Sequence, residues 1–234
     1  MSDAVSEDQV VRDRPPGVDD RAGAAPRGGH EITEAERERR AAALAEIRVF
    51  GDPVLRSPAS EVSEFGPELA RDAERMVGLM RDAIGVGLAA TQIGVMRRML
   101  VFQAGLEATP TALANPVVEW LSDERAVAEE GCLSLPRISV DVERPLHARI
   151  RGMDVRGEPL MIEASGLEAR VLQHEIDHLD GVLTLDRAER SQRKQALRAL
   201  REGTSYSPSD EEDDEETAGR APGEPPESGR GATR

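Results

Sequence analysis

Several residue types are scarce in this chain of 234 residues, and each scarcity sets a limit. The single cysteine, Cys132, excludes an intramolecular disulfide framework and a zinc ribbon. No stretch approaches the roughly 18 consecutive apolar residues of a membrane helix. The acidic start of the sequence lacks the apolar region of a secretory signal. We therefore expect a cytoplasmic protein that does not insert into a membrane.

The net charge of −15 is concentrated at the two ends. Residues 1–30 hold six acids and four bases, and residues 203–234 hold nine acids and three bases, including DEEDDEE at 210–216. Both segments have too few apolar residues to offset chain entropy. We expect a disordered N-terminal extension over 1–30, one folded domain over 31–202 and a disordered acidic tail over 203–234. The acidic total argues against a protein that coats nucleic acid.

Periodicity within the domain predicts helices and short strands. Thr33 and Glu36 form a capping box for the first helix, and Ser165 is the expected cap of the third. Pro and Gly separate the strand-like runs, without a βαβ rhythm, so the expected class is α+β: antiparallel strands packed around a central buried helix. The expected helices are 34–46, 67–82, 166–179 and 187–201; the expected strands are 99–102, 116–120, 146–155 and 159–164.

The central helix contains the sequence HEIDH at 174–178, which matches H-E-x-x-H. Residues four apart on a helix lie on one side, so His174 and His178 can share a divalent metal. Glu175 is turned about 100° from His174 and can reach a metal-bound water without being a ligand. There it can take a proton and pass it to a leaving group.

A catalytic metal needs a third ligand. Leu167 and Val171 extend the histidine stripe, and apolar residues occupy the opposite side, so the helix is buried on most faces and its polar groups need partners. Downstream, Glu189 and Glu202 are available, but they lie in a basic helix and at its end. The better candidate is Cys132, whose alternative role is that of a small buried residue.

Three motifs resemble those of the peptide deformylase family, over about residues 46–190. They are GVGLAATQIG at 85–94, with Thr91 where the family usually has proline, EGCLS at 130–134 and HEIDHLDG at 174–181. The stretches GDPVLR at 51–56 and GVLTLDR at 181–187 are also similar to family sequence. The resemblance implies the peptide deformylase fold.

The resemblance also implies a metal site and a reaction. Cys132, His174 and His178 would hold one divalent metal with water as fourth ligand. Fe(II) is the expected metal, with Zn, Ni or Co as alternatives. The implied reaction is hydrolysis of the N-formyl group of nascent formyl-methionyl peptides, which releases formate. Glu175 would move the proton, while the Gln92 side-chain amide and the Leu133 backbone N–H would stabilise the oxyanion.

The resemblance extends to residues that would bind the peptide. Gly87 would lie along the substrate backbone, and Val86, Leu167 and Val171 would form the methionine slot. Glu130 would orient the substrate or support a ligand. Alternatives stay open for each: turn glycines, ordinary core residues and, for Gln92, a buried amide that closes a loop. No function is assigned to Asp177.

Residues 187–201 hold six bases and one acid. One interpretation is a solvated amphipathic helix with Leu197 and Leu200 packed inward. The resemblance suggests another, since a basic C-terminal helix docks some bacterial deformylases on the ribosome, where phosphate contacts would be salt-sensitive. The tail at 210–216 would then compete with RNA for the helix. We expect a monomer.

Two other functions remain open. An HExxH endopeptidase would take its third ligand from a residue other than Cys132. A non-catalytic member of the same fold would act as a binding module, although such a protein would usually have lost part of the site. The variant Cys132→Ala separates the first of these from a deformylase.

Overall fold

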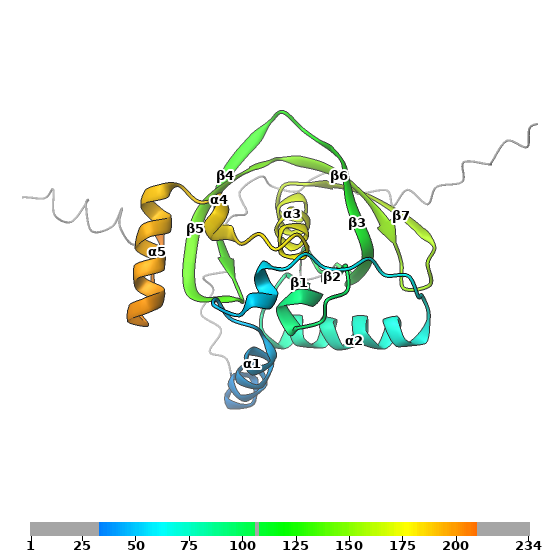
Figure 1. Ribbon diagram of the computed structural model, residues 1–234, viewed down its shortest axis with the longest axis horizontal. Helices are drawn as coiled ribbons and strands as arrows, with labels where there is room; N and C mark the ends of the chain where they lie inside the picture. The colour runs from blue at the N-terminus through cyan, green and yellow to red at the C-terminus, as the bar shows by residue number, and fades with distance from the viewer. Residues whose placement is uncertain (1–32, 106–107, 210–234) are drawn as a thin grey trace, which may run out of the picture.

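The central helix of the fold lies between two antiparallel sheets (Figure 1). The computed structural model describes residues 33–105 and 108–209. The disorder expected over 1–30, and the part of that expected over 203–234 that begins at residue 210, lie outside the described residues. Helix α3, Leu167–Leu179, carries HEIDH and packs on β1, β2 and β7 of a five-stranded sheet and on β5 of a two-stranded hairpin. The expected α+β class is confirmed. Within the described ranges no helix is long and apolar enough to cross a membrane.

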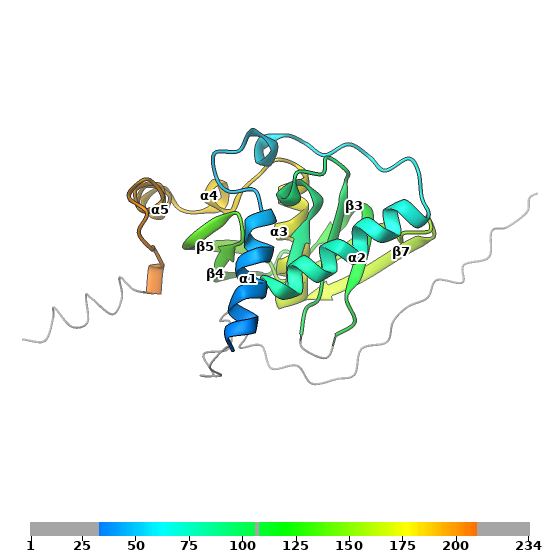
Figure 2. The ribbon, with the colours of Figure 1, turned by 90° about the horizontal axis from the view of Figure 1, so that it is seen from below.

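The five-stranded sheet has the order β1-β2-β3-β6-β7, and each neighbouring pair is antiparallel. Its strands are β1 Gly87–Ala89, β2 Met99–Phe102, β3 Thr111–Leu121, β6 His147–Met153 and β7 Pro159–Ser165. The hairpin consists of β4 Arg125–Cys132 and β5 Leu135–Pro145. The remaining helices are α1 Glu34–Glu46, α2 Pro67–Asp82, α4 Thr184–Arg187 and α5 Arg190–Glu202, with 3-10 turns η1 Pro53–Arg56 and η2 Ala90–Ile93. Figure 2 shows α5 at the opposite end of the molecule from β7.

The predicted helices 34–46 and 67–82 are confirmed, as is the capping box of Thr33 and Glu36. Three strands were not predicted: β1, β4 and β5. In β5 the inward side chains alternate over Ile138, Val140 and Val142, but the series ends in the buried Arg144. The alternation of these three apolar residues with polar ones was a period-two signal that the prediction did not use, and Arg144 marks where it ends.

Two helix boundaries differ from those expected. Ser165 does not cap α3: it ends β7, and its hydroxyl lies 2.8 Å from Nδ1 of His147, while Gly166 precedes the helix without a side-chain cap. The expected helix 187–201 is divided into α4 and α5. The chain is extended at Ala188 and Glu189, with ψ values of 154° and 150°, and α5 begins only at Arg190.

The chain stays on the domain beyond the boundary expected at residue 202. Tyr206 accepts a backbone hydrogen bond from Ser139 and donates one to Arg137, so this segment pairs with the outer edge of β5. The Ser207 hydroxyl donates to Glu129. The described part of the domain therefore extends to Ser209, because these residues satisfy backbone groups that an edge strand would otherwise leave exposed.

The core positions α3 rigidly. Leu172, Ile176 and Leu179 pack into the five-stranded sheet, which confirms the second apolar stripe of this helix. Burying each such side chain stabilises the fold by about 1.5–3 kcal/mol. The helix ends as expected at Asp180, followed by Gly181 with φ 74°, where a Cβ would lie 2.8 Å from the backbone of Arg56. The two histidines are therefore held on a helix fixed at its C-terminal end.

Candidate metal centre

The three expected metal ligands come together from two elements. Cys132 ends β4, and His174 and His178 lie one turn apart on α3. Sγ of Cys132 lies 3.2 Å from Nε2 of His178, and the ligand atoms of all three residues lie within 4.8 Å of one another. A tetrahedral ion with ordinary metal–sulfur and metal–nitrogen bonds needs about 3.6 Å between such atoms. The donor set therefore fits a single divalent metal.

A carboxylate fixes the ring of His174. Its Nδ1 lies 3.0 Å from Oε2 of Glu130, so Nε2 is the nitrogen that remains for a metal. Glu130 is itself held by Nε and Nη2 of Arg144, at 2.6 and 2.9 Å, and by Arg170 at 2.7 Å. This places Glu130, only 6 % exposed, behind the metal ligand and away from solvent. This position suits a group that orients the His174 ring better than one that contacts a peptide.

The charges around the ligands favour a cation. Burial alone would raise the pKa of the Cys132 thiol, but His178 and His174 outweigh it and hold that pKa well below its usual value. Burial alone would lower the pKa of His174, but Cys132 and Glu130 hold it well above its usual value. A thiolate and a carboxylate thus stabilise positive charge on either side of one imidazole. Either a proton or a metal cation benefits from that arrangement.

Glu175 stands beside the ligands in a closely packed position. Its side chain is 4 % exposed, and its Oε2 has no hydrogen-bond partner among the described residues. Burial raises the pKa of this carboxyl, which suits a group that takes up and returns a proton. Gly87 makes room for it, because a Cβ there would lie 2.4 Å from Oε1 of Glu175.

The Gln92 amide has a settled orientation. The Ala89 N–H donates to Oε1 at 2.8 Å, so Oε1 is the oxygen and Nε2 is the donor. Nε2 points to Sγ of Cys132 at 3.8 Å and to the hydroxyl of Ser134 at 3.3 Å. Gln92 therefore presents its donor side to the metal ligands. Its oxygen also closes the turn at η2 by accepting the Ala89 N–H, as the structural alternative expects.

The other expected site residues differ in how far they are exposed. Leu133 is the first residue of the turn between β4 and β5, directly after Cys132. Val86 and Leu167 expose 46 % and 38 % of their surface, so apolar surface at both positions is open to a ligand. Val171 is only 5 % exposed and packs in the core of α3 and the larger sheet. The structure thus favours the core alternative for Val171 more than for the other two.

Sequence reasoning missed Arg144 and Ser134. Arg144 is 4 % exposed and bridges Glu130 to Asp177, whose Oδ2 lies 2.9 Å from Nη1. Arg144 lies on the same face of β5 as Val140 and Val142, and this spacing was the available signal. An arginine buried on such a face needs carboxylate partners. Ser134 gave no signal of its own, because its contact with Gln92 joins residues 42 apart in sequence.

Three donor side chains that fit one divalent ion, beside a buried carboxyl with one unpartnered oxygen, are the arrangement expected of a hydrolase that works through a metal. Comparison with known proteins gives the particular family. Residues 44–194 match the family model for polypeptide deformylase. The chain therefore belongs to the peptide deformylase family, hydrolases that remove the N-formyl group.

Relatives in sequence and in structure agree with this assignment. The peptide deformylase of Acidothermus cellulolyticus is 48 % identical over 160 residues, 68 % of this chain and 87 % of that protein. That of Thermotoga neapolitana is 48 % identical over 141 residues, 60 % of this chain and 85 % of that protein. The solved peptide deformylase of Synechococcus elongatus, a complex with actinonin, is 39 % identical with a TM-score of 0.64 and covers 68 % of this chain and 88 % of its own.

Proposed function

We propose that this chain removes formyl groups from formyl-methionyl nascent peptides with Fe(II) held by Cys132, His174 and His178. The observation that carries the proposal is the donor set itself. One thiolate and two imidazoles suit Fe(II), and Zn, Ni or Co can occupy the same set. The lowered pKa of Cys132 supports the thiolate form, which is the form that binds metal.

The residues around the ion divide the remaining work. When bound, a divalent metal supplies Lewis acidity and lowers the pKa of a water toward neutrality. Glu175 takes a proton from the attacking water and returns it to the departing amine. The Nε2 of Gln92 and the backbone N–H of Leu133 donate hydrogen bonds to the negative charge that develops on the formyl oxygen. Glu130 holds the tautomer and orientation of His174.

The peptide would lie along β1. Val86 and Leu167 leave apolar surface exposed that a methionine side chain would cover, and Val171 lies one turn beyond Leu167 on α3. Gly87 has no side chain to obstruct a peptide backbone. We propose these four residues as the substrate contacts, with Val171 forming the floor of the slot.

The test is formate release from formyl-Met-Ala-Ser by anaerobically purified protein, with metal content measured in the same preparation. Release by the Fe(II) form is the expected result. Absence of release with Fe(II), Ni(II) and Co(II) would leave the non-catalytic binding module as the surviving interpretation. In parallel, Cys132→Ala should lose both metal and activity. Retention of both would place the third ligand elsewhere, as in an endopeptidase.

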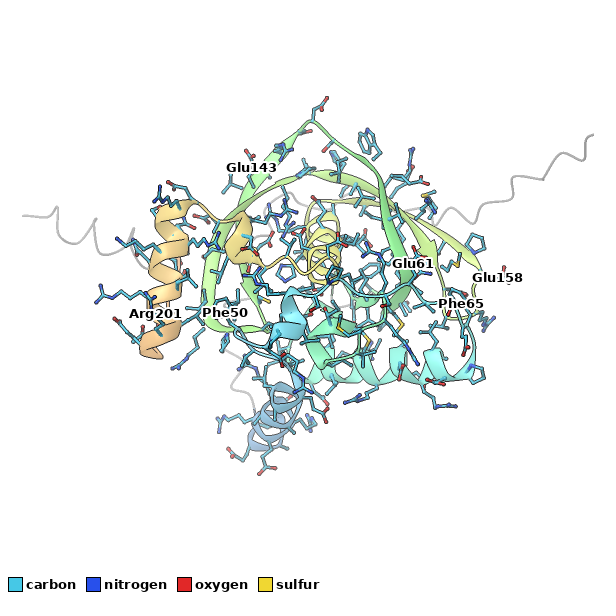
Figure 3. All side chains as sticks on the ribbon, in the orientation of Figure 1. Phe50, Glu61, Phe65, Glu143, Glu158 and Arg201 are labelled. Carbon is cyan, nitrogen blue, oxygen red and sulfur yellow. The ribbon has the colours of Figure 1, made fainter. Side chains whose placement is uncertain are left out.

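We further propose that α5 docks on ribosomal RNA. Arg190, Arg193, Lys194 and Arg201 lie at helical spacing along one side of α5. Figure 3 shows Arg201 at the outer side of the molecule. The seven acids of 210–216 would compete for this face. Leu197 and Leu200 pack against the core, as expected for an amphipathic helix. The basic residues would bind RNA from the opposite, exposed side of the same helix.

A truncation after Ser209 tests the competition, because it keeps Tyr206 on β5 and removes the acidic run. The shortened chain should co-sediment with ribosomes at higher salt than the full chain. Unchanged co-sedimentation at low salt would refute a masking role for the tail. We also propose a monomeric state, and a cytoplasmic location because formylated nascent chains are made there.

A further inference from the structure

A buried chain of ion pairs leads from His174 back to the same helix. Glu130 contacts His174, Arg144 contacts Glu130, and Asp177 contacts Arg144. The side chains of Arg144 and Glu130 are each 5 % exposed and that of Asp177 is 11 % exposed. Asp177 is the fourth residue of HEIDH, and it contacts no metal ligand through its side chain in the described hydrogen bonds.

Three donors of Arg144 are engaged at once. Nε and Nη2 form the fork that grips both oxygens of Glu130, at 2.6 and 2.9 Å. Nη1 donates to Oδ2 of Asp177 at 2.9 Å. Because the guanidinium is planar, fixing Nη1 also fixes the direction in which the fork opens. Asp177 therefore helps to decide where Glu130 sits and, through it, how the ring of His174 is turned.

The elements joined by this chain are those that carry the metal ligands. Glu130 is two residues before Cys132 on β4, Arg144 belongs to β5, and Asp177 lies between His174 and His178 on α3. A network among them sets the position of the hairpin relative to the helix, and with it the spacing of the thiolate and the imidazoles. Burying these charges is costly, and well-packed apolar residues often serve stability equally well. Stability alone therefore gives little reason for the arrangement.

We propose that Asp177 is a positioning residue for the metal centre, acting on His174 through Arg144 and Glu130. Arg187 completes its surroundings from the surface, with Nη2 donating to Oδ1 at 2.6 Å and Nε to Oδ2 at 3.2 Å. This inference rests on the metal site proposed above. The rate of metal release and the Co(II) spectrum, which test it, are measured without deformylase activity.

The experiment compares Asp177→Asn with Asp180→Asn in the Ni(II)- and Co(II)-loaded protein. Asp180 is a matched control: it follows the same helix and binds an arginine, with its Oδ1 2.6 Å from Nη1 of Arg98, but it does not connect to Glu130. Metal release to an excess chelator should be about ten-fold faster in Asp177→Asn. Substituting a group that orients a metal ligand typically weakens metal binding by about 10- to 100-fold, and we expect the lower end of that range. Release should stay unchanged in Asp180→Asn.

A spectroscopic readout separates positioning from general loosening. The visible absorption of bound Co(II) should shift in Asp177→Asn and not in Asp180→Asn, while the KM for formyl-Met-Ala-Ser stays unchanged and kcat falls. Equal release rates in the wild type and Asp177→Asn would overturn the proposal, as would equal acceleration in both variants. If Asp177→Asn does not fold, Asp177→Glu makes the same comparison, because it keeps the charge and displaces it by one methylene.

Discussion

Replacing Gly87 with alanine should displace the buried carboxylate of Glu175. The added Cβ would lie 2.4 Å from Oε1, 2.8 Å from Cγ and 2.9 Å from Cδ of that side chain. Ordinary contacts between such atoms begin near 3.5 Å, so the carboxylate must move by about 1 Å. Glu175 lies on a helix packed into the core, and the displacement therefore falls on its side chain.

A shift of about 1 Å in a catalytic group can cost about 100-fold in rate, or roughly 2.7 kcal/mol of transition-state stabilisation. Overpacking of a filled site also lowers folding stability by about 1–3 kcal/mol. Gly87→Ala should thus show a reduced kcat/KM for formate release and a reduced Tm. Metal content should be retained, since Gly87 contacts none of the three ligands in the clash described above.

Gly131→Ala is the matched control. Gly131 precedes the ligand Cys132, but a Cβ there meets only the Ser139 hydroxyl, at 4.0 Å. This variant should keep its Tm. If it lost as much kcat/KM as Gly87→Ala, the position of the glycine near the metal, and not the contact with Glu175, would account for both losses.

A double-mutant cycle separates the clash from any effect on peptide binding, because Tm is measured without substrate. In a Glu175→Ala background all three clashing atoms are gone, so Gly87→Ala should cost little further stability. The reasoning would be refuted by an equal loss of Tm in both backgrounds, or by a kcat/KM of Gly87→Ala within three-fold of the wild type.

Three further predictions concern single side chains. Gln92→Leu removes the donor near the metal and should lower kcat for formate release about 100- to 1000-fold; a loss below ten-fold would contradict that role. Burial would raise the pKa of Asp186, but Arg56 holds it lower, so the carboxylate stabilises the fold above its unfolded pKa and the benefit is lost as the pH falls through the folded value. Asp186→Asn should therefore lower Tm at pH 7, and the difference from wild type should disappear as the pH falls through the lowered pKa of the folded protein. The Asn115 side chain accepts a hydrogen bond from the Val62 N–H at 2.8 Å and donates one to the Val62 carbonyl at 2.9 Å. Asn115→Ala should lower the free energy of unfolding in urea by about 1–3 kcal/mol. The stability of Asn115→Asp should fall between that of the wild type and that of Asn115→Ala.

The sequence was most informative where chemistry depends on local spacing. The one-turn separation of His174 and His178, the capping box at Thr33 and the apolar stripe of α3 all follow from residues within a few positions of one another. Cys132 was placed beside them by the family resemblance, and the structure brings the three together.

Contacts between distant elements could not be predicted in the same way. The pairing of Glu130 with His174 depends on how the hairpin meets α3, and these residues are 44 apart. The need for glycine at 87 depends on the side chain of Glu175, which approaches from α3. Sequence reasoning explained that glycine by the substrate or by a turn, because neither segment alone reveals how the two elements pack on each other.

The exposed face of α5 has a consequence for chemical labelling. Lys194, which lines that face, is the only lysine in the sequence. Amine-directed reagents, apart from reaction at the chain's N-terminus, would therefore attach to one side chain, and that side chain sits on the proposed docking helix. A fluorophore or a cross-linker can be placed there without mutation. Protection of Lys194 from acylation would report directly on whatever covers α5, whether RNA or the acidic run.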